Sequence, residues 1–299
     1  MASQKQTNVF LVINKFAGHH KKINKIKDDV ITFLQRNGCH VDHAFTQYGG
    51  HATTITADAL QKGFELIVAV GGDGTVNEVS QGLKGTAGKM GIIPIGSGNG
   101  LARELGISMR VGKSKRTLLE GKIRHIDVCR INDHPFLCTC GIGFDAQIAW
   151  QMDQSASRGF WRYIQLTIRE SLRFKSFRIN MNVDGTVWNE NVFMVTFANI
   201  SQFGNHAYIA PKAAINDGLI DMVVIKPFHK IWLPVLGLLL FTPAIPLLPF
   251  VECHKIKGAE LIEADAPRLH YDGEAEKPLF PAAIAIDHAT LPVMAPKKI

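Results

Sequence analysis

The strongest constraint on the fold is a strand, a glycine turn and a helix that follow one another directly between Ile67 and Glu78, in the stretch IVAVGGDGTVNE. The largely apolar run over 64–70 is typical of a parallel strand that is buried on both faces. Two glycines end this run. Thr75 and Glu78 have the spacing of a capping box, which predicts that the helix begins at Thr75.

Strands and helices alternate over the first part of the chain, up to about Asp127. This alternation is typical of an α/β domain with a doubly wound parallel sheet. From the spacing of apolar residues, we predict strands over 9–13, 41–45 and 64–70 and helices over 21–36 and 51–62.

Beyond Asp127 the pattern changes to short strands joined by tight turns. Asp184-Gly185 lies between the runs 177–183 and 187–198, and this pair strongly favours a two-residue hairpin turn. The run 219–225 alternates, as a half-buried strand does, and a basic helical segment is predicted near 159–173. The second half is therefore predicted to be mostly antiparallel β-structure.

A second glycine turn follows the first. Residues 91–106, GIIPIGSGNGLARELG, comprise an apolar run, a turn of small residues, a helix and a closing glycine. Two such turns at the carboxyl ends of neighbouring parallel strands are expected to line one crevice, where open α/β sheets bind ligands. Backbone N–H groups and helix N-termini there favour phosphate.

Asp73 places a negative charge inside this predicted phosphate site, so we expect it to face a cation. It would hold a water molecule bound to magnesium, or a Lys or Arg that reaches the phosphates. The alternative is an ordinary glycine-rich turn with a solvated aspartate. The stretch lacks both the Gly-Lys-Ser/Thr ending of a P-loop and the third glycine of a dinucleotide-binding fingerprint.

The charge of the chain narrows the class of partner. Its 299 residues carry a formal net charge of +7, which suits nucleotide phosphates or an anionic membrane surface. No pattern of a nucleic-acid-binding module is present, so no nucleic acid is expected as a partner. The five cysteines contain no C-x-x-C pair and predict reduced thiols. The first ten residues lack an apolar core, so we expect no signal peptide and a cytoplasmic location.

The two glycine turns together resemble those of the diacylglycerol kinase catalytic domain family, which includes bacterial lipid kinases and sphingosine kinases. The first turn, GGDGTVNEV, is shared with the distantly related NAD kinases and phosphofructokinases, whereas its combination with PIGSGNGLARELG is specific to the lipid kinases. Later stretches extend the resemblance from about Asn8 to Pro292. They are GIGFDA at 141–146, IAP at 209–211, NDGLID at 216–221 and YDGE at 271–274.

This resemblance implies an α/β nucleotide-binding domain with a parallel sheet like that of NAD kinase and phosphofructokinase, followed by an antiparallel β-sandwich-like domain. The first domain is expected over 1–127 and the second, which would bind the lipid substrate, over 128–288. Residues 289–299 would return to the first domain. The implied activity is an ATP- and magnesium-dependent transfer of the γ-phosphate to a hydroxyl of diacylglycerol or a related lipid.

The resemblance also implies catalytic residues. Asp272 would be the general base that accepts the proton of the hydroxyl. Glu274 would orient Asp272 or a metal-bound water if 271–274 is extended, because alternate residues of a strand share a face. Without its companion motifs this stretch would be interpreted as a hairpin turn, which Asp-Gly favours.

Further implied residues bind the nucleotide and magnesium. Asp73 and Asp127 would belong to a polar network around catalytic magnesium. A structural magnesium would bind the side chain of Asp217 and the carbonyl groups of Ala214 and Leu219. The residues implied to contact ATP are Asn14, Thr46, Gly71, Gly72, Asp73, Gly74, Thr75, Val76, Asn77, Glu78, Ser97 and Asn99.

Two positions depart from the family pattern. Lys15 follows Asn14, where the family commonly has proline. Gly100 follows Asn99, where some bacterial members have an aspartate that would complete the magnesium network. The sequence therefore leaves open which residues complete the magnesium network.

A long uncharged segment, 231–251, follows in the second half. By length it could span a bilayer of about 30 Å, but four prolines interrupt it and would leave backbone groups unpaired. We expect a short helix and an irregular apolar flap in which 238–240 and 247–250 meet a membrane surface, or else a helix packed on the β domain. The flanking cations expected to suit lipid headgroups are Lys230, His254, Lys255 and Lys257.

Two competing hypotheses remain from the sequence. A soluble enzyme of the NAD kinase type would explain GGDGT but neither the second turn nor the apolar segment. A non-catalytic lipid- or nucleotide-binding protein would leave the retention of Asp272 and Glu274 without a reason. The sequence does not name the lipid, and it leaves open whether the chain forms a homodimer.

Overall fold

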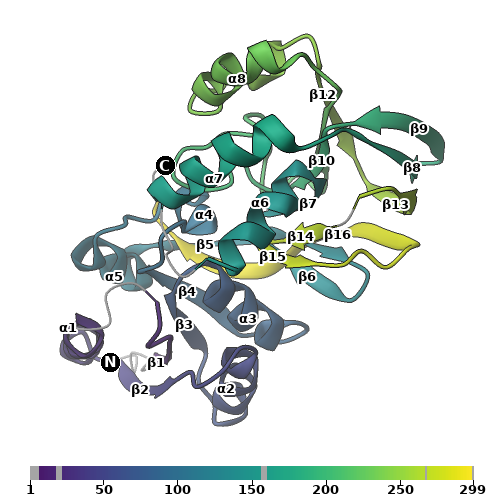
Figure 1. The fold of residues 1–299 in the computed structure, drawn as a ribbon. Coiled ribbons are helices and arrows are strands. Elements are labelled where there is room, and N and C mark those ends of the chain that lie inside the picture. Colours follow the sequence, from purple (N-terminus) through teal and green to yellow (C-terminus); the bar gives the residue numbers. More distant parts are fainter. Residues whose placement is uncertain (1–6, 18–21, 156–159, 267, 298–299) are drawn as a thin grey trace. The chain divides into compact units, whose positions relative to one another are not determined.

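The computed structural model describes residues 7–17, 22–155, 160–266 and 268–297. They form two compact units (Figure 1). The first consists of the chain up to Ile126 and again from Ala289, and the second consists of Asp127–His288.

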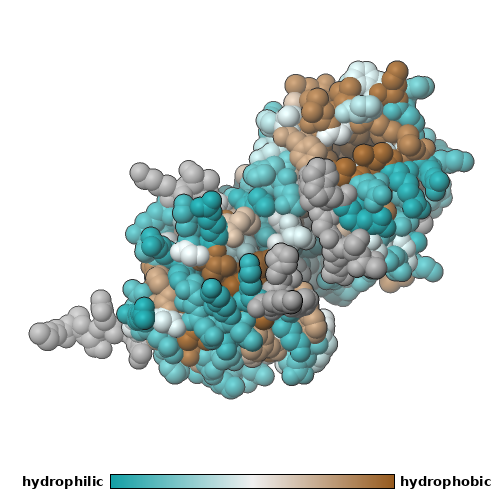
Figure 2. All heavy atoms as spheres, turned by 60° about the vertical axis from the view of Figure 1, so that its left-hand side comes forward, coloured by the Kyte–Doolittle hydropathy of each residue, from teal (hydrophilic) through white to brown (hydrophobic). Residues whose placement is uncertain are grey.

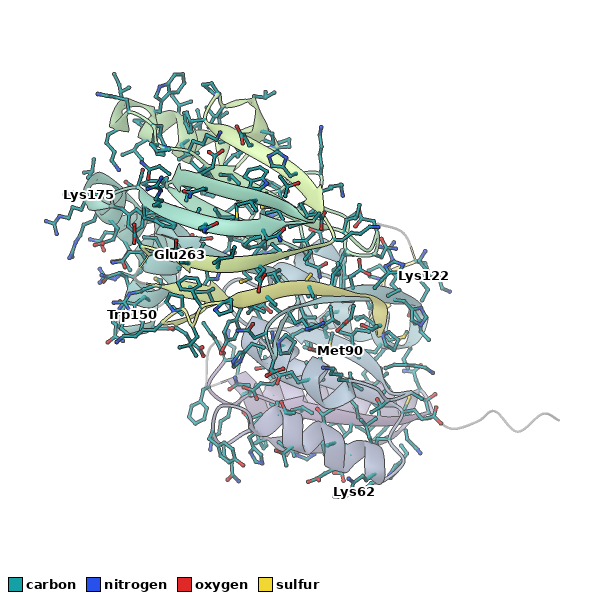
Figure 3. All side chains as sticks on the ribbon, turned by 90° about the vertical axis from the view of Figure 1, so that its right-hand side faces the viewer. Lys62, Met90, Lys122, Trp150, Lys175 and Glu263 are labelled. Carbon is teal, nitrogen blue, oxygen red and sulfur yellow. The ribbon has the colours of Figure 1, made fainter. Side chains whose placement is uncertain are left out.

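The first unit is a parallel sheet between helices. Its strands are β1 (Asn8–Ile13), β2 (His40–Phe45), β3 (Leu66–Gly71), β4 (Lys89–Pro94) and the end of β16 (Ala282–Ala295), and its helices are α1 (Ile23–Arg36), α2 (His51–Gln61), α3 (Asp73–Leu83), α4 (Gly100–Glu104) and α5 (Val111–Glu120). The strands lie in the order β2-β1-β3-β4-β16. The end of β16 joins the sheet where Val293 pairs with Met90, which is fully buried (Figure 3).

Helices cover both faces of this sheet, and this explains its apolar strands. Val9, Leu11 and Ile13 of β1 pack in one core with residues of α1 and α5, while α2 and α3 lie on the opposite face (Figure 1). Every residue of β3 is buried, as the run 64–70 predicts for a strand in a doubly wound sheet.

The second unit contains two antiparallel sheets. Its strands are β5 (Lys122–Ile131, which enters from the first unit), β6 (His134–Phe136), β7 (Thr139–Gly143), β8 (Phe177–Val183), β9 (Thr186–Val192), β10 (Met194–Ala198), β11 (Ile220–Ile225), β12 (Val251–Ile256), β13 (Gly258–Ala264), β14 (Leu269–Tyr271) and β15 (Glu274–Glu276). One sheet has the order β12-β11-β10-β7-β14-β15, and the other contains β16-β13-β8-β9. A hydrophobic core contains residues of both sheets, so the expected β-sandwich-like architecture is confirmed.

Helices cover the second unit's six-stranded sheet on the face away from that core. They are α6 (Phe144–Asp153), α7 (Phe160–Arg173) and α8 (Leu233–Leu239) (Figure 1). Gly159, part of the predicted helical segment, lies outside the described residues, and α6 was not predicted. Because both faces of the sheet are covered, β11 is buried at every position. The prediction of a half-buried, alternating strand over 219–225 is therefore wrong.

The hairpin predicted at Asp184-Gly185 is confirmed, but its second strand is shorter than predicted. β8 and β9 pair across this turn, and both turn residues have positive φ. The run 187–198 is not one strand, because it divides at Phe193 into β9 and β10, which belong to different sheets. β9, TVWNENV, is largely polar and mostly exposed, whereas β10, MVTFA, is buried throughout, so the change of pattern near Phe193 marks the division that the prediction missed.

Candidate active site

The carboxyl ends of the four parallel strands bring the predicted nucleotide residues of the first unit together. Asn14 follows β1 and Thr46 follows β2, and the two glycine turns follow β3 and β4. Backbone hydrogen bonds align the ends of neighbouring strands. Asn14 N–H donates to the carbonyl of Val70 at 3.0 Å, and Thr46 N–H donates to the carbonyl of Ile13 at 2.9 Å. The strand order reverses between β1 and β3, and such a switch point is where open α/β sheets bind ligands.

The two glycine turns touch backbone to backbone. A Cβ atom on Gly96 would lie 2.5 Å from the Cα atom of Gly72, and one on Gly98 would lie 2.9 Å from Oδ2 of Asp73. Asn99 shapes the second turn, since its side chain both accepts from and donates to the backbone of Gly96, at 3.0 and 2.7 Å. Only a residue without a side chain fits at Gly96, so the predicted crevice is lined largely by backbone.

The helix after the first turn begins earlier than predicted. α3 starts at Asp73, and Gly72 is its N-cap residue without any side-chain cap. The capping-box prediction is wrong because Thr75 lies inside the helix, where its hydroxyl accepts a hydrogen bond from Asn14 Nδ2 at 3.0 Å. The first turn of α3, with Asp73 in it, therefore points its N-terminus at the crevice.

Four residues of this stretch have side chains engaged within the first unit. Oε2 of Glu78 accepts from Ala52 N–H at 2.9 Å, at the start of α2, so Glu78 caps a neighbouring helix. Thr75, Val76 and Asn77 are at most 7% exposed. Any contact of these three with a nucleotide would thus come from the helix backbone.

Sequence reasoning missed Arg103 as a neighbour of the second turn. Its Nε donates to the carbonyl of Gly98 at 3.0 Å, which places a cationic side chain beside the turn that carries Ser97. Ser97 itself is exposed. The spacing of Arg103 in PIGSGNGLARELG, on the first turn of the following helix, is the pattern that could have identified it.

Asp272 stands at the tip of the β14–β15 hairpin. Asp272 and Gly273 both have positive φ, so 271–274 forms a tight turn and is not extended. The shared-face argument for Glu274 is therefore wrong, and Glu274 is exposed. The carboxylate of Asp272 accepts three backbone hydrogen bonds, from Leu137 at 2.8 Å, Cys138 at 2.8 Å and Thr139 at 3.1 Å.

Leu137 and Cys138 lie in the turn between β6 and β7, and Thr139 is the first residue of β7. The backbone N–H groups bind both oxygens of the Asp272 carboxylate, so the carboxylate is held in one position. A side chain held by such contacts has the fixed position that proton transfer to or from a hydroxyl requires.

A buried polar cluster lies next to this hairpin and was missed by sequence reasoning. Oδ2 of Asp145 accepts from the Thr196 hydroxyl at 2.7 Å. It also lies 3.2 Å from Nε2 of His270, although the ring is not aligned for a hydrogen bond. Asp145, Thr196 and His270 are all buried. His270 precedes Asp272 by two residues, so this cluster connects the hairpin to the residues around α6.

Asp127 is fully buried and interacts within the second unit. One oxygen accepts from Gly218 N–H at 2.8 Å, and the other lies 2.8 Å from Nδ1 of His288. Both oxygens of Asp127 are thus engaged by the chain, and its place in a polar network around magnesium stays a prediction. Asp127 belongs to a different unit from Asp73.

The predicted structural magnesium site contains a lysine. Nζ of Lys255 lies 2.6 Å from Oδ2 of Asp217 and 3.2 Å from Oδ2 of Asp221, while Oδ1 of Asp217 accepts from Leu219 N–H at 3.1 Å. Burial raises the pKa of the Asp221 carboxyl, and the ammonium of Lys255 opposes that shift. The donor set that the resemblance implies, with Asp217 as its carboxylate, does not fit magnesium in this arrangement. Among the described residues no group of three or more His, Cys, Asp or Glu side chains is placed to hold a metal.

An apolar cavity of about 550 Å³ lies in the second unit. Its walls come from α6, α7, α8 and the strands β10 and β11. Asp145 is among its few charged lining residues, and burial raises the pKa of Tyr163 to about 12, so its phenol is neutral. The other lining residues include Ile148, Ile164, Phe193, Met194, Ile225, Leu236, Leu240 and Phe241.

The segment 231–251 contributes to this cavity and also to the surface. Leu248 and Phe250 are buried in the core on the helical face of the sheet, so the expectation that all of 247–250 meets a membrane is wrong. Leu238 and Leu247 are 70% and 81% exposed. Across the described residues, no helix is both long enough and apolar enough to cross a membrane.

Lys230, expected to meet lipid headgroups, is instead tied to α7. Its ammonium donates to the carbonyl groups of Ser171 and Phe174, at 2.6 and 2.9 Å, and lies 4.8 Å from the centre of the Phe193 ring. Burial lowers the pKa of this ammonium. The bonds join the beginning of the 231–251 segment to the C-terminal end of α7, where a cation is favoured.

Two family models match the chain. The diacylglycerol kinase catalytic domain matches residues 8–131. The YegS C-terminal NAD kinase beta sandwich-like domain matches residues 138–295, more than half of the chain.

Relatives match over most of their length. A probable YegS-like lipid kinase of Chromohalobacter salexigens is 26% identical over 75% of this chain and 73% of its own. A diacylglycerol kinase of Bacillus subtilis is 28% identical over 66% and 67%. A solved structure of a putative diacylglycerol kinase from Bacillus anthracis superposes with a TM-score of 0.77 at 20% identity, covering 98% of each chain, which supports the fold.

Proposed function

Because the chain belongs to the diacylglycerol kinase catalytic domain family of lipid kinases, we propose that it transfers the γ-phosphate of ATP to a hydroxyl group of diacylglycerol or a related lipid. The observation that carries the choice of a lipid is the apolar cavity of the second unit. A cavity of this size and lining suits a hydrocarbon chain.

ATP is proposed to bind at the glycine turns of the first unit. Backbone N–H groups of 72–74 and the N-terminus of α3 would receive the phosphates. Magnesium bound with the nucleotide would neutralise phosphate charge. The carboxylate of Asp73 lies beside Gly98 of the second turn. Asp73 therefore fits as the residue that would bind a water molecule coordinated to this magnesium ion.

The close approach of the turns makes Gly96 a test of this site. In Gly96→Ala the new methyl group would meet the backbone of Gly72 and the amide oxygen of Asn99, which accepts a hydrogen bond from Gly96 N–H. Overpacking of about 1–3 kcal/mol would separate the turns and weaken ATP binding by roughly tenfold or more. Calorimetry with ATP measures this. Gly112→Ala, in open space on α5, is the matched control, and equal affinity in both variants would contradict the assignment.

The acceptor lipid is proposed to place a chain in the cavity and its hydroxyl near Asp272. Asp145 lines the cavity and contacts His270, two residues before Asp272. The polar end of the cavity therefore lies next to the hairpin that carries the proposed base. As the hydroxyl oxygen attacks the γ-phosphorus, the bond from that phosphorus to the bridging oxygen would break, ADP would leave, and Asp272 would accept the proton of the hydroxyl.

The cavity itself is tested by two variants of one helix. Leu236 lines the cavity and Leu238 does not, so Leu236→Trp should fill it while Leu238→Trp leaves it open. We expect kcat/KM for a long-chain diacylglycerol to fall by about tenfold or more in Leu236→Trp only, a size typical of hydrophobic-pocket discrimination. A short-chain, water-soluble acceptor should be affected less. An equal loss with both acceptors would mean that Leu236 supports the fold and not chain binding.

The lipid would be reached at a membrane surface. Figure 2 shows hydrophobic residues gathered at the upper right of the view. Exposed apolar side chains on α7 are Ile168 and Leu172, and those on and around α8 are Ile231, Trp232, Val235, Leu238, Phe241 and Leu247. Exposed cations on α7 and just beyond it are Arg169, Arg173 and Lys175, of which Figure 3 labels Lys175. Apolar side chains flanked by cations suit the interface of an anionic bilayer, so we propose peripheral membrane association.

The function is tested directly by transfer of radiolabel. Purified protein would be incubated with γ-labelled ATP and magnesium, and with vesicles containing diacylglycerol, a sphingoid base or ceramide, or with NAD in solution. Labelled phosphatidate or another labelled lipid is expected. Labelled NADP without labelled lipid would favour the NAD kinase type, and no transfer to any acceptor would favour a binding protein.

A further inference from the structure

Lys255 is bound between two carboxylates of the segment that was expected to hold a structural magnesium. It lies on β12, directly opposite Asp221 of β11 in the antiparallel pairing. From this position its ammonium reaches both Asp221 and Asp217, at 3.2 and 2.6 Å. The lysine is thus placed by strand register, not by a mobile loop.

A divalent ion at Asp217 would have to displace this ammonium. One oxygen of Asp217 is bonded to Leu219 N–H and the other to Lys255. An ion on the second oxygen would lie within a few ångströms of a like charge, and magnesium demands near-octahedral oxygen ligands. If Lys255 moved away, Asp221, whose side chain is 9% exposed, would lose its cationic partner, and an unpaired buried carboxylate is costly.

The same segment supports the buried Asp127. Gly218 N–H donates to the Asp127 carboxylate and Asp127 N–H donates to the carbonyl of Ile215, both at 2.8 Å. A cation that orders residues 215–218 therefore also determines the surroundings of Asp127.

We infer that the ammonium of Lys255 is the resident cation of the 214–221 segment, in the position where the family resemblance implies a divalent ion. The order of this segment, and the stability of the second unit, are then independent of divalent metal. The inference concerns folding and does not depend on the proposed kinase activity.

Thermal unfolding without nucleotide or lipid tests it. The wild-type chain should melt within about 1 °C of the same temperature in 5 mM magnesium chloride and in chelator, because an ion that does not bind the native state cannot stabilise it. Lys255→Gln should melt lower in chelator and regain about 3 °C or more in magnesium, since the two carboxylates can then accept the ion. Calcium provides a second probe of the same site.

Three further variants make the result specific. Lys255→Arg keeps the charge and should respond to magnesium no more than wild type. Lys257→Gln removes an exposed lysine from the next outward-facing position and should also not respond. Adding Asp217→Asn to Lys255→Gln should abolish the regained stability. A wild-type melting temperature that rises by several degrees in magnesium would overturn the inference, and this measurement decides the matter even if Lys255→Gln fails to fold.

Discussion

Replacing Asp272 by asparagine is expected to lower kcat by on the order of a thousandfold, the middle of the range for loss of a positioned general base. The backbone donors of 137–139 hold this carboxylate in place. Asparagine tolerates the positive φ of the turn and keeps one acceptor oxygen. Its amide would face a backbone N–H, however, and cost about 1–3 kcal/mol of stability.

A second Asp-Gly turn supplies the control. Asp184 also has positive φ, and its carboxylate accepts backbone hydrogen bonds from Lys257 and Gly258. Asp184→Asn should therefore have a similar cost in stability without the loss of turnover. Single-turnover transfer to diacylglycerol and thermal melting of both variants measure the difference. More than a tenth of wild-type turnover in Asp272→Asn would assign the base to another group.

Asp73→Asn is expected to reduce turnover at least about a hundredfold, the scale for loss of one preorganised electrostatic group. The change keeps the side chain's shape beside Gly98 and removes only its charge. As an acid in the first turn of α3, Asp73 contributes about 0.3–1 kcal/mol to stability, so the variant should fold. Asp58→Asn, on the exposed side of α2, is the control within the same unit.

The dependence of turnover on magnesium concentration provides a further test of the role of Asp73. If Asp73 holds a magnesium-bound water, Asp73→Asn should need a higher magnesium concentration for half-maximal activity, while its affinity for nucleotide in chelator is unchanged. Wild-type turnover at every magnesium concentration would leave Asp73 as a solvated turn residue, the alternative that the sequence left open.

The sequence by itself determined the two classes of sheet, because side-chain periodicity reports burial. An apolar run that ends in glycines, as over 64–72, has few solutions other than a parallel strand followed by a helix. The Asp184-Gly185 pair determined a hairpin, because few residues adopt positive φ in succession. The two glycine turns could likewise be predicted from the sequence, because the need for residues without side chains appears within a few adjacent positions.

The tertiary structure alone decided which side chains meet. Glu78 has the right spacing to cap its own helix, yet it caps α2, because helix packing brought another N-terminus closer. Lys255 and Asp217 are 38 residues apart and meet only through the pairing of β11 with β12, and His270 reaches Asp145 through the pairing of β14 with β7. Sequence periodicity reports whether a position is buried, but the partner across a sheet depends on register and topology, which long-range packing determines.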